Sequence, residues 1–150
     1  MAEKIRISGG GRCNFTNRTV APERFLSANP RFALSALSRF TPAHVVERLD
    51  RAGIAWHEKT LGQLFCDGSA TQVVALFLAG MAEAGVELLL RTAVRSVGRG
   101  ALFEVGTDAG TIAAERLVVA TGGLSIPKMG ASGLGYRIAG DFGLSLVATR

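Results

Sequence analysis

Hydrophobic and polar residues follow one another along the chain with the periods of both strands and helices. Alternation over residues 4–8 predicts a short strand, which runs into a loop of three glycines at 9–11. Thr41 followed by Pro42 is typical of a helix start, because a capping hydroxyl precedes a proline at the first helical position. Gly53 predicts the end of that helix.

The same reasoning predicts further helices. Residues 71–84 are apolar on nearly all sides, so we expect a helix that is largely buried. A weaker helical pattern over 22–40 has Phe32, Leu34 and Leu37 as its expected buried face. Further strands are predicted over 54–57, 63–66, 86–90, 92–97, 101–105, 111–114 and 116–120, and a last short helix over 136–142.

These elements indicate an α/β fold. The run over 116–120 is apolar throughout, as in a parallel strand covered on both faces, and the turn at 108–110 predicts an antiparallel hairpin. We find no internal repeat and no linker, so we expect residues 1–150 to form one compact unit. The strand at 4–8 lacks upstream segments that could supply its parallel neighbours.

Composition excludes several classes of protein. The 150 residues suffice for one domain, and 48% hydrophobic against 19% charged residues excludes a disordered chain. The longest apolar run, 73–82, is about half the roughly 20 residues of a membrane span, and no secretory leader opens the chain. Cys13 and Cys66 have no metal-ligand spacing. We therefore expect a reduced, cytoplasmic protein without a metal site.

Positive charge is concentrated in the first 40 residues. They hold seven basic and two acidic residues, whereas the other 110 residues hold ten of each sign. Such an excess fits either a phosphate-bearing ligand or a solvated surface. The arginines stand singly, and we do not expect them to combine with aromatic residues into a surface on which bases stack.

The sequence does not match the common catalytic and nucleotide-binding motifs with which we compared it. The chain has no P-loop, and Asn14 stands where the third glycine of a dinucleotide-binding turn belongs. His44 and His57 lack a partner at metal spacing, and we expect His44 at the surface. Cys13 has no evident base beside it, so we expect a packed thiol. We assign no catalytic residue.

Two glycine-rich segments remain as candidates for binding. Residues 8–14 read SGGGRCN, and residues 120–123 read ATGG ahead of 127–130. Glycines after a strand expose backbone N–H groups that can hold a phosphate, and Arg12 and Asn14 add a charge and polar groups. The alternative is a tight turn that needs glycine for positive φ, with Arg12 in solvent.

Both segments resemble the signatures of one family. Residues 4–17 and 120–136 are similar to two motifs of the HI0933-like, or BaiN-type, FAD-dependent oxidoreductases, and the likeness extends over the whole chain. Members of that family are longer and carry a Gly-x-Gly-x-x-Gly turn upstream of these motifs. The resemblance therefore implies a Rossmann-like FAD-binding domain, truncated here at both ends. Without the upstream turn we expect the isolated segment to bind FAD weakly or not at all.

The resemblance also implies a cofactor site. FAD would carry the redox chemistry, with NAD(P)H as its reductant. The implied cofactor-binding residues are Lys4, Ser8, Gly9, Gly10, Gly11, Arg12, Cys13, Asn14, Ala93, Val94, Ala120, Thr121, Gly122 and Gly123.

Family members differ in substrate, so several functions stay open. Our leading expectation is an oxidoreductase acting on a small organic molecule, such as one with a conjugated carbon–carbon double bond. Reduction of uridine in ribosomal RNA is the second hypothesis, with RNA as the less favoured partner. A third is an inactive fragment or a non-catalytic α/β module. We expect no membrane partner.

Overall fold

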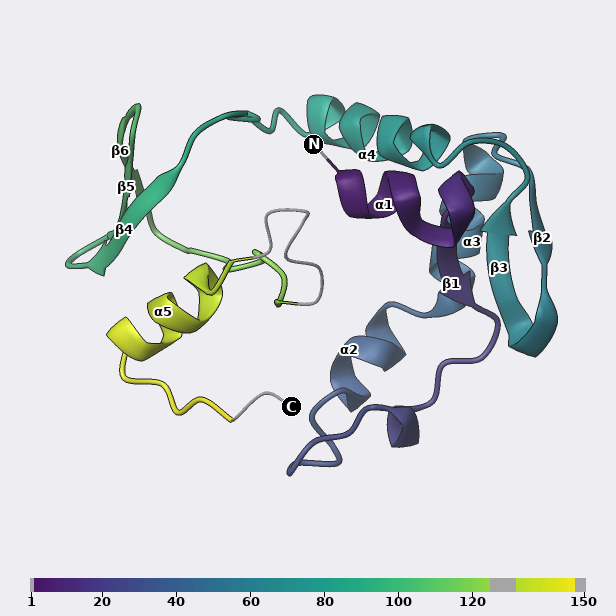
Figure 1. Ribbon diagram of the computed structural model, residues 1–150, viewed down its shortest axis with the longest axis horizontal. Helices are drawn as coiled ribbons and strands as arrows, with labels where there is room; N and C mark the ends of the chain where they lie inside the picture. Colours follow the sequence, from purple (N-terminus) through teal and green to yellow (C-terminus); the bar gives the residue numbers. More distant parts are fainter. Residues whose placement is uncertain (1, 125–131, 148–150) are drawn as a thin grey trace. The chain divides into compact units, whose positions relative to one another are not determined.

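The computed structural model describes residues 2–124 and 132–147. It forms two compact units, Met1–Glu87 and Leu88–Arg150, and each is described by itself (Figure 1). The first unit contains α1 (Glu3–Ile7), η1 (Ser8–Gly11), β1 (Asn14–Asn17), η2 (Pro22–Arg24), α2 (Leu34–Arg39), α3 (Pro42–Arg51), β2 (Trp56–Glu58), η3 (Thr60–Gly62), β3 (Gln63–Cys66) and α4 (Thr71–Glu83). The second contains β4 (Val94–Arg99), β5 (Phe103–Thr107), β6 (Gly110–Ala114) and α5 (Leu134–Asp141).

An antiparallel sheet organises the first unit. Its strands lie in the order β1-β3-β2, and Phe65 in the central strand faces Asn14 on one side and His57 on the other. Both strands predicted at 54–57 and 63–66 are confirmed. The buried core lies where this sheet meets α3 and the start of α4, and it consists of Cys13, Leu49, Ile54, Cys66, Ala70 and Val73.

The start of α3 follows the local sequence signal closely. The Thr41 hydroxyl accepts from the backbone of the third helical residue, and the Thr41 N–H donates to His44 Nδ1 at 3.0 Å. This reciprocal capping satisfies backbone donors that the first helical turn leaves unpaired. His44 is exposed, as predicted, and its function in the fold is to close the helix end. Gly53 follows the helix with φ 65°.

The second unit contains a three-stranded antiparallel meander. Its order is β4-β5-β6, and Thr107 faces Gly110 across the tight turn that joins β5 to β6. The predicted hairpin is thus confirmed. The last helix, α5, begins two residues before its predicted start and ends ahead of Gly143, which has φ 68°. Helices with small antiparallel sheets confirm the α/β class.

Three predicted strands are wrong. Residues 4–8 form α1 and the start of η1, with Ile5 packed against the core while Ile7 is 49% exposed. Residues 86–90 and 116–120 run without strand pairing in the described part of the chain. A strand needs a hydrogen-bonding neighbour, and neither apolar run has one among those residues. Val118 is accordingly 84% exposed.

Two helical predictions also need correction. The helix α4 forms as expected, but Val73 is its one buried residue and Phe77 is 54% exposed. The reason is that α4 packs along one side, where α1 lies against it. Residues 22–40 form η2 and α2 instead of one helix, and Phe32, expected in a buried face, is 76% exposed. No helix within 2–124 and 132–147 is long and apolar enough to span a bilayer.

Candidate functional site

The glycine-rich segment forms a left-handed turn between α1 and β1. Gly9, Gly10 and Gly11 have φ of 58°, 67° and 86°, a region that side chains with a Cβ rarely adopt. Cys13 also lies there, with φ 56°. The expected need for glycine at positive φ is confirmed. The prediction that a strand precedes the turn is wrong, because the preceding element is the helix α1.

Hydrogen bonds fix this turn to the elements on both sides of it. The Ser8 hydroxyl donates to the Ile5 carbonyl at 2.8 Å, which ties the turn to α1. The Cys13 N–H donates to the Ser8 carbonyl at 3.0 Å and closes the turn. The Ala70 N–H, just ahead of α4, donates to the Gly11 carbonyl at 2.7 Å. The backbone path is therefore set by the fold around it.

The three glycines face different surroundings. A Cβ on Gly9 would overlap the ring of Phe65, reaching Cδ1 at 2.8 Å. A Cβ on Gly10 would meet nothing within 4 Å, and one on Gly11 would meet only the Arg6 carbonyl at 3.9 Å. Gly9 is thus required by packing. Gly10 and Gly11 present bare backbone to open space, as a backbone cradle for a ligand would.

Both cysteines beside the turn are buried, which keeps their thiols away from reagents in solvent. Cys13 and Cys66 are free thiols, 5% and 0% exposed, and they share the core of the first unit. Burial raises the pKa of the Cys66 thiol to about 11, with smaller contributions from Cys13 and Asp67. Cys66 is therefore neutral at physiological pH. The expectation that Cys13 is a packed thiol is confirmed.

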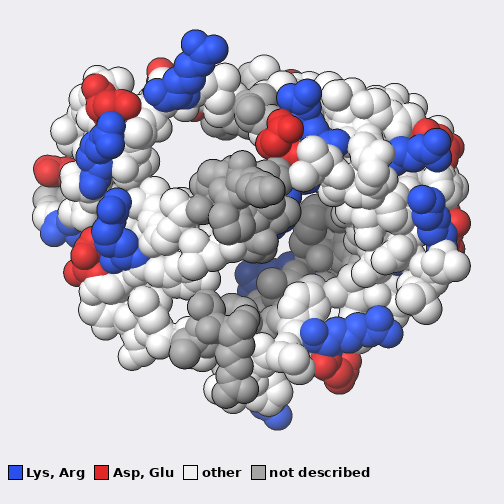
Figure 2. Space-filling model, in the orientation of Figure 1, with Lys and Arg blue, Asp and Glu red and all other residues white. Residues whose placement is uncertain are grey.

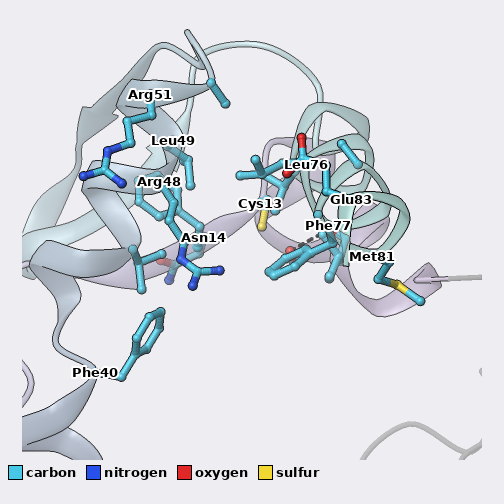
Figure 3. Close-up of a pocket in the computed structure, with 18 of the residues that line it drawn as sticks. Cys13, Asn14, Phe40, Arg48, Leu49, Arg51, Leu76, Phe77, Met81 and Glu83 are labelled. Atoms are coloured by element: carbon cyan, nitrogen blue, oxygen red, sulfur yellow. Dashed lines mark hydrogen bonds between the residues drawn. The ribbon is translucent and has the colours of Figure 1, made fainter. Parts of the chain in front are cut away.

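A pocket of about 1150 Å³ lies in the first unit among α1, β1, α3 and α4. Figure 3 shows Arg48 and Leu49 of α3 on one side, Leu76, Phe77 and Met81 of α4 on the other, and Cys13 and Asn14 between them. Its volume suffices for a large ligand, and its walls are mostly apolar with a few convergent polar groups. Of the predicted cofactor residues, this pocket brings together Lys4, Ser8, Cys13 and Asn14.

The polar side chains of the candidate site differ in how they are held. With its amide nitrogen toward the sheet, Asn14 donates to the carbonyls of Thr16 at 2.9 Å and Leu64 at 3.2 Å. Arg12 is exposed, and no ion pair within the described residues involves it. Asn14 is thus largely committed to the fold, whereas the Arg12 guanidinium is available to an anion.

The predicted residues at the start of β4, Ala93 just before the strand and Val94 within it, already make backbone contacts. The Ala93 N–H donates to Asp108 Oδ1 at 3.0 Å, and the Ala93 carbonyl accepts from the Asp108 N–H at 3.2 Å. Val94 faces Thr107 in the ladder between β4 and β5. A carbonyl oxygen has a second lone pair, so a ligand could still bond to the Ala93 carbonyl.

The second glycine segment lies against the start of α5. Residues 120–123 have no regular secondary structure, Gly122 has φ 73°, and a Cβ on Gly135 would lie 2.8 Å from Thr121 Oγ1. A cavity of about 410 Å³ adjoins this contact, lined by Val119, Thr121, Gly122, Gly123, Gly135 and Tyr136. The neighbouring residues 127–130 lie outside the described residues. That the two glycine segments, with Ala120 to Gly123 as the second, meet on one cofactor stays a prediction.

Sequence reasoning missed most side chains around the first unit's site, and two of them bear on its chemistry or packing. Phe65 packs on Gly9, and Arg48 reaches the pocket from α3. Phe65 faces Asn14, the last residue of the glycine-rich segment, across the β1–β3 ladder, and this pairing between segments far apart in sequence could not be predicted locally. Nothing in the sequence pattern distinguishes Arg48 from Arg51, the other exposed arginine of α3, which also lines the pocket.

Known proteins resemble the chain along nearly all its length. It is 50% identical over 148 residues to the ribosomal RNA dihydrouridine synthase of Escherichia coli (strain K12), covering 98% of this chain and 37% of that protein. It is 41% identical over 155 residues to the Haemophilus influenzae protein of the same name, covering 100% and 39%. A 3-dehydro-bile acid delta(4,6)-reductase of Clostridium scindens is 26% identical over 149 residues, covering 97% and 36%. The chain thus spans little more than a third of these relatives.

These relatives correct two expectations. A small organic substrate was the leading hypothesis, with RNA the less favoured partner. The two relatives that share 50% and 41% identity are both named for a reaction on ribosomal RNA, whereas the bile acid reductase shares 26%. The order of the two hypotheses is therefore wrong. Substrate preference could not be inferred from motifs that the whole family shares.

Family membership follows from the match along the chain. The sequence model of the HI0933-like protein Rossmann domain matches residues 1–149, and both glycine segments lie inside that match. The chain therefore belongs to the HI0933-like family and represents its Rossmann domain.

Proposed function

We propose that the chain is the FAD-binding part of an enzyme that reduces uridine to dihydrouridine in ribosomal RNA. The observation that carries this proposal is the 50% identity to a ribosomal RNA dihydrouridine synthase over 98% of the chain. The Haemophilus influenzae relative supports the same substrate. A ribosomal RNA substrate would place the reaction in the cytoplasm.

The turn at 8–14 fits the phosphates of a dinucleotide. The backbone at Gly10 and Gly11 faces open space, and Arg12, the next residue, is exposed and has no ion pair in the described part of the chain. Left-handed glycine backbone of this kind forms a concavity for anions, and a guanidinium can bond a phosphate with two parallel N–H groups. We assign pyrophosphate contacts to this turn and to Lys4. Adenine contacts are assigned to Ala93 and Val94, and a further contact to 120–123.

The proposed reaction adds two hydrogens across the C5–C6 double bond of uracil. A hydride and a proton are added to the two carbons, and the double bond becomes a single bond. The hydride would come from reduced FAD when that cofactor is bound, with NAD(P)H as the proposed source of the electrons. The residues of this chain hold the cofactor and orient it. The proton donor is not assigned to a residue.

Deleting the gene is the direct test of the proposed function. We expect dihydrouridine to disappear from ribosomal RNA, as measured by mass spectrometry of nucleosides from purified ribosomes. Reintroducing the gene should restore it. Dihydrouridine in transfer RNA from the same cells is the control and should not change. Unchanged dihydrouridine in ribosomal RNA of the deletion strain would refute the proposal.

Arg12→Lys tests the assignment of the turn. In the full-length protein we expect FAD affinity to fall about tenfold, because a lysine ammonium cannot reproduce the planar two-pronged contact of a guanidinium. Arg6→Lys is the matched control, since Arg6 is exposed in the same unit and pairs with Glu3 at 3.4 Å. Flavin fluorescence titration measures both. Equal FAD affinity of the two variants would assign Arg12 to the solvated surface.

A further inference from the structure

Arg-Phe dipeptides occur three times in the segment that joins β1 to α3. They are residues 24–25, 31–32 and 39–40, so the arginines recur after seven and eight positions. In the structure Phe25, Phe32 and Phe40 are 46%, 76% and 49% exposed. Each of these arginines is thus followed by an aromatic residue that is at least partly exposed, although we did not expect a base-stacking surface in this region. We call residues 24–40 the Arg-Phe segment.

The arginines of this segment are available for a ligand. Neighbouring arginines are paired, Arg18 with Glu58 and Arg51 with Glu47. Arg24, Arg31 and Arg39 are exposed and take part in no ion pair within residues 2–124 and 132–147. In Figure 2 basic side chains are scattered over the face shown, and several of them lie beside acidic ones.

The three phenylalanines are not equivalent. Phe40 stacks on the His44 ring, with centroids 5.8 Å apart, and the Arg48 guanidinium lies 5.4 Å from the Phe40 centroid. Phe40 is thus held by α3, whereas no ring contact within the described residues involves Phe25 or Phe32. Their rings are the ones available to a planar ligand.

Local hydrogen bonds shape the loop that carries Arg31 and Phe32. The Asn29 N–H donates to Ser27 Oγ at 3.2 Å, and the Arg31 N–H donates to Asn29 Oδ1 at 3.0 Å. The Phe32 N–H donates to the Asn29 carbonyl at 3.0 Å. Side-chain bonds of this kind fix turns outside helices and sheets. In Figure 1 this loop extends from the end of β1 to α2.

We propose that the Arg-Phe segment binds the unpaired RNA strand beside the uridine that is reduced. The inference rests on the proposed function, because reduction of a base requires that the base leave its stack. Its neighbours then lose stacking partners, which the rings of Phe25 and Phe32 replace. Arg24, Arg31 and Arg39 contact the phosphates between them. Exposed aromatic rings with interspersed cations are how single strands are held without reading their sequence.

Replacing the three arginines with glutamine tests the phosphate contacts. Binding of a fluorescein-labelled uridine-rich RNA of about 12 nucleotides is followed by anisotropy across a salt series. We expect Arg24→Gln, Arg31→Gln and Arg39→Gln together to reduce the slope of log affinity against log salt by about 2, since each single-strand phosphate contributes about 0.7. The matched control changes Arg91, Arg99 and Arg116 to glutamine and should keep the wild-type slope. Equal slopes in the two triple variants would overturn the proposal.

Replacing Phe25 and Phe32 with leucine tests the stacking. Leucine keeps an apolar side chain but removes the ring, so we expect RNA affinity to fall about tenfold with an unchanged melting temperature. A lower melting temperature with unchanged RNA affinity would mean that these rings pack against protein, and it would overturn the proposal.

The wild-type protein separates this inference from the proposed function. If wild type restores dihydrouridine to ribosomal RNA of the deletion strain but both sets of variants bind RNA as wild type does, only the assignment of the Arg-Phe segment fails. If wild type neither binds the RNA nor restores dihydrouridine, the proposed function fails and the assignment fails with it. Flavin content, measured by absorbance, should be equal in all variants.

Discussion

Gly9→Ala is expected to lower the free energy of unfolding of the first unit by about 3 kcal/mol. Alanine at φ 58° costs about 1–2 kcal/mol, because its Cβ approaches the carbonyl oxygen that follows. The new methyl group also overlaps the Phe65 ring, and forcing it in costs about 1–3 kcal/mol more. Phe65 is 7% exposed in the central strand, so it has little room to move.

Gly10→Ala is the matched control for this prediction. Gly10 has nearly the same φ, 67°, but a Cβ there meets nothing within 4 Å, so only the backbone cost of about 1–2 kcal/mol applies. Trp56 is the single tryptophan and lies in the first unit, so urea unfolding followed by its fluorescence reports on the affected region. Equal losses in the two variants would mean that Phe65 adapts freely.

Gly9→Ala should have the larger effect on stability, whereas Gly10→Ala should have the larger effect on FAD affinity. A methyl group on Gly10 points into the open space where the proposed phosphates would lie, whereas a methyl group on Gly9 points at Phe65. Gly10→Ala should therefore reduce FAD affinity by more than its loss of stability would explain. This contrast separates a turn that serves the fold alone from a turn that also holds a ligand.

Elements with strong local signals could be predicted from the sequence. The α3 helix begins where Thr41 and Pro42 predict, because the capping hydroxyl and the proline act within one turn. The β5–β6 hairpin forms where the turn at 108–110 predicts, because a tight turn fixes the register of both strands. In both cases the deciding interactions lie within a few residues along the chain.

Elements that depend on distant partners could not be predicted in this way. The runs at 86–90 and 116–120 have strand-like composition, but a strand also needs a neighbour, and the described residues supply none. The alternation over 4–8 is too short to distinguish a strand from one turn of helix. Phe32 fits a helical face by spacing, yet it is 76% exposed because the segment around it is a loop.

The backbone conformation of the candidate site could be predicted from the sequence, but the side chains that pack against it could not. Three successive glycines predict left-handed backbone, which Gly9, Gly10 and Gly11 all adopt. Which of them is needed for packing depends on Phe65, more than fifty positions away in sequence. The proposed RNA substrate could not be inferred from the motifs, because the resemblance relates them to holding a dinucleotide and not to the molecule that is reduced.

Raising the pH from 8 to 11 is expected to destabilise the first unit through Cys66. Burial lifts the pKa of this thiol from 9.0 to about 11, so the folded state holds the proton more tightly than the unfolded state. The stabilising contribution is complete below pH 9 and is lost as the pH rises through about 11. A shift of this size corresponds to about 2–3 kcal/mol, since one pKa unit is about 1.4 kcal/mol.

Cys66→Ala isolates this contribution from other groups that titrate at high pH. Lysine and tyrosine side chains ionise over the same range in both proteins, so the difference between wild type and variant reports on Cys66 alone. Trp56 faces Cys66 directly across the β2–β3 ladder, and its fluorescence therefore follows unfolding at the relevant place. Wild type should lose about 2–3 kcal/mol more than Cys66→Ala between pH 8 and 11. If the stability of wild type and of Cys66→Ala changed in parallel with pH, the thiol would be hydrated. The strand that carries Cys66 would then be less firmly packed than the 0% exposure of Cys66 implies.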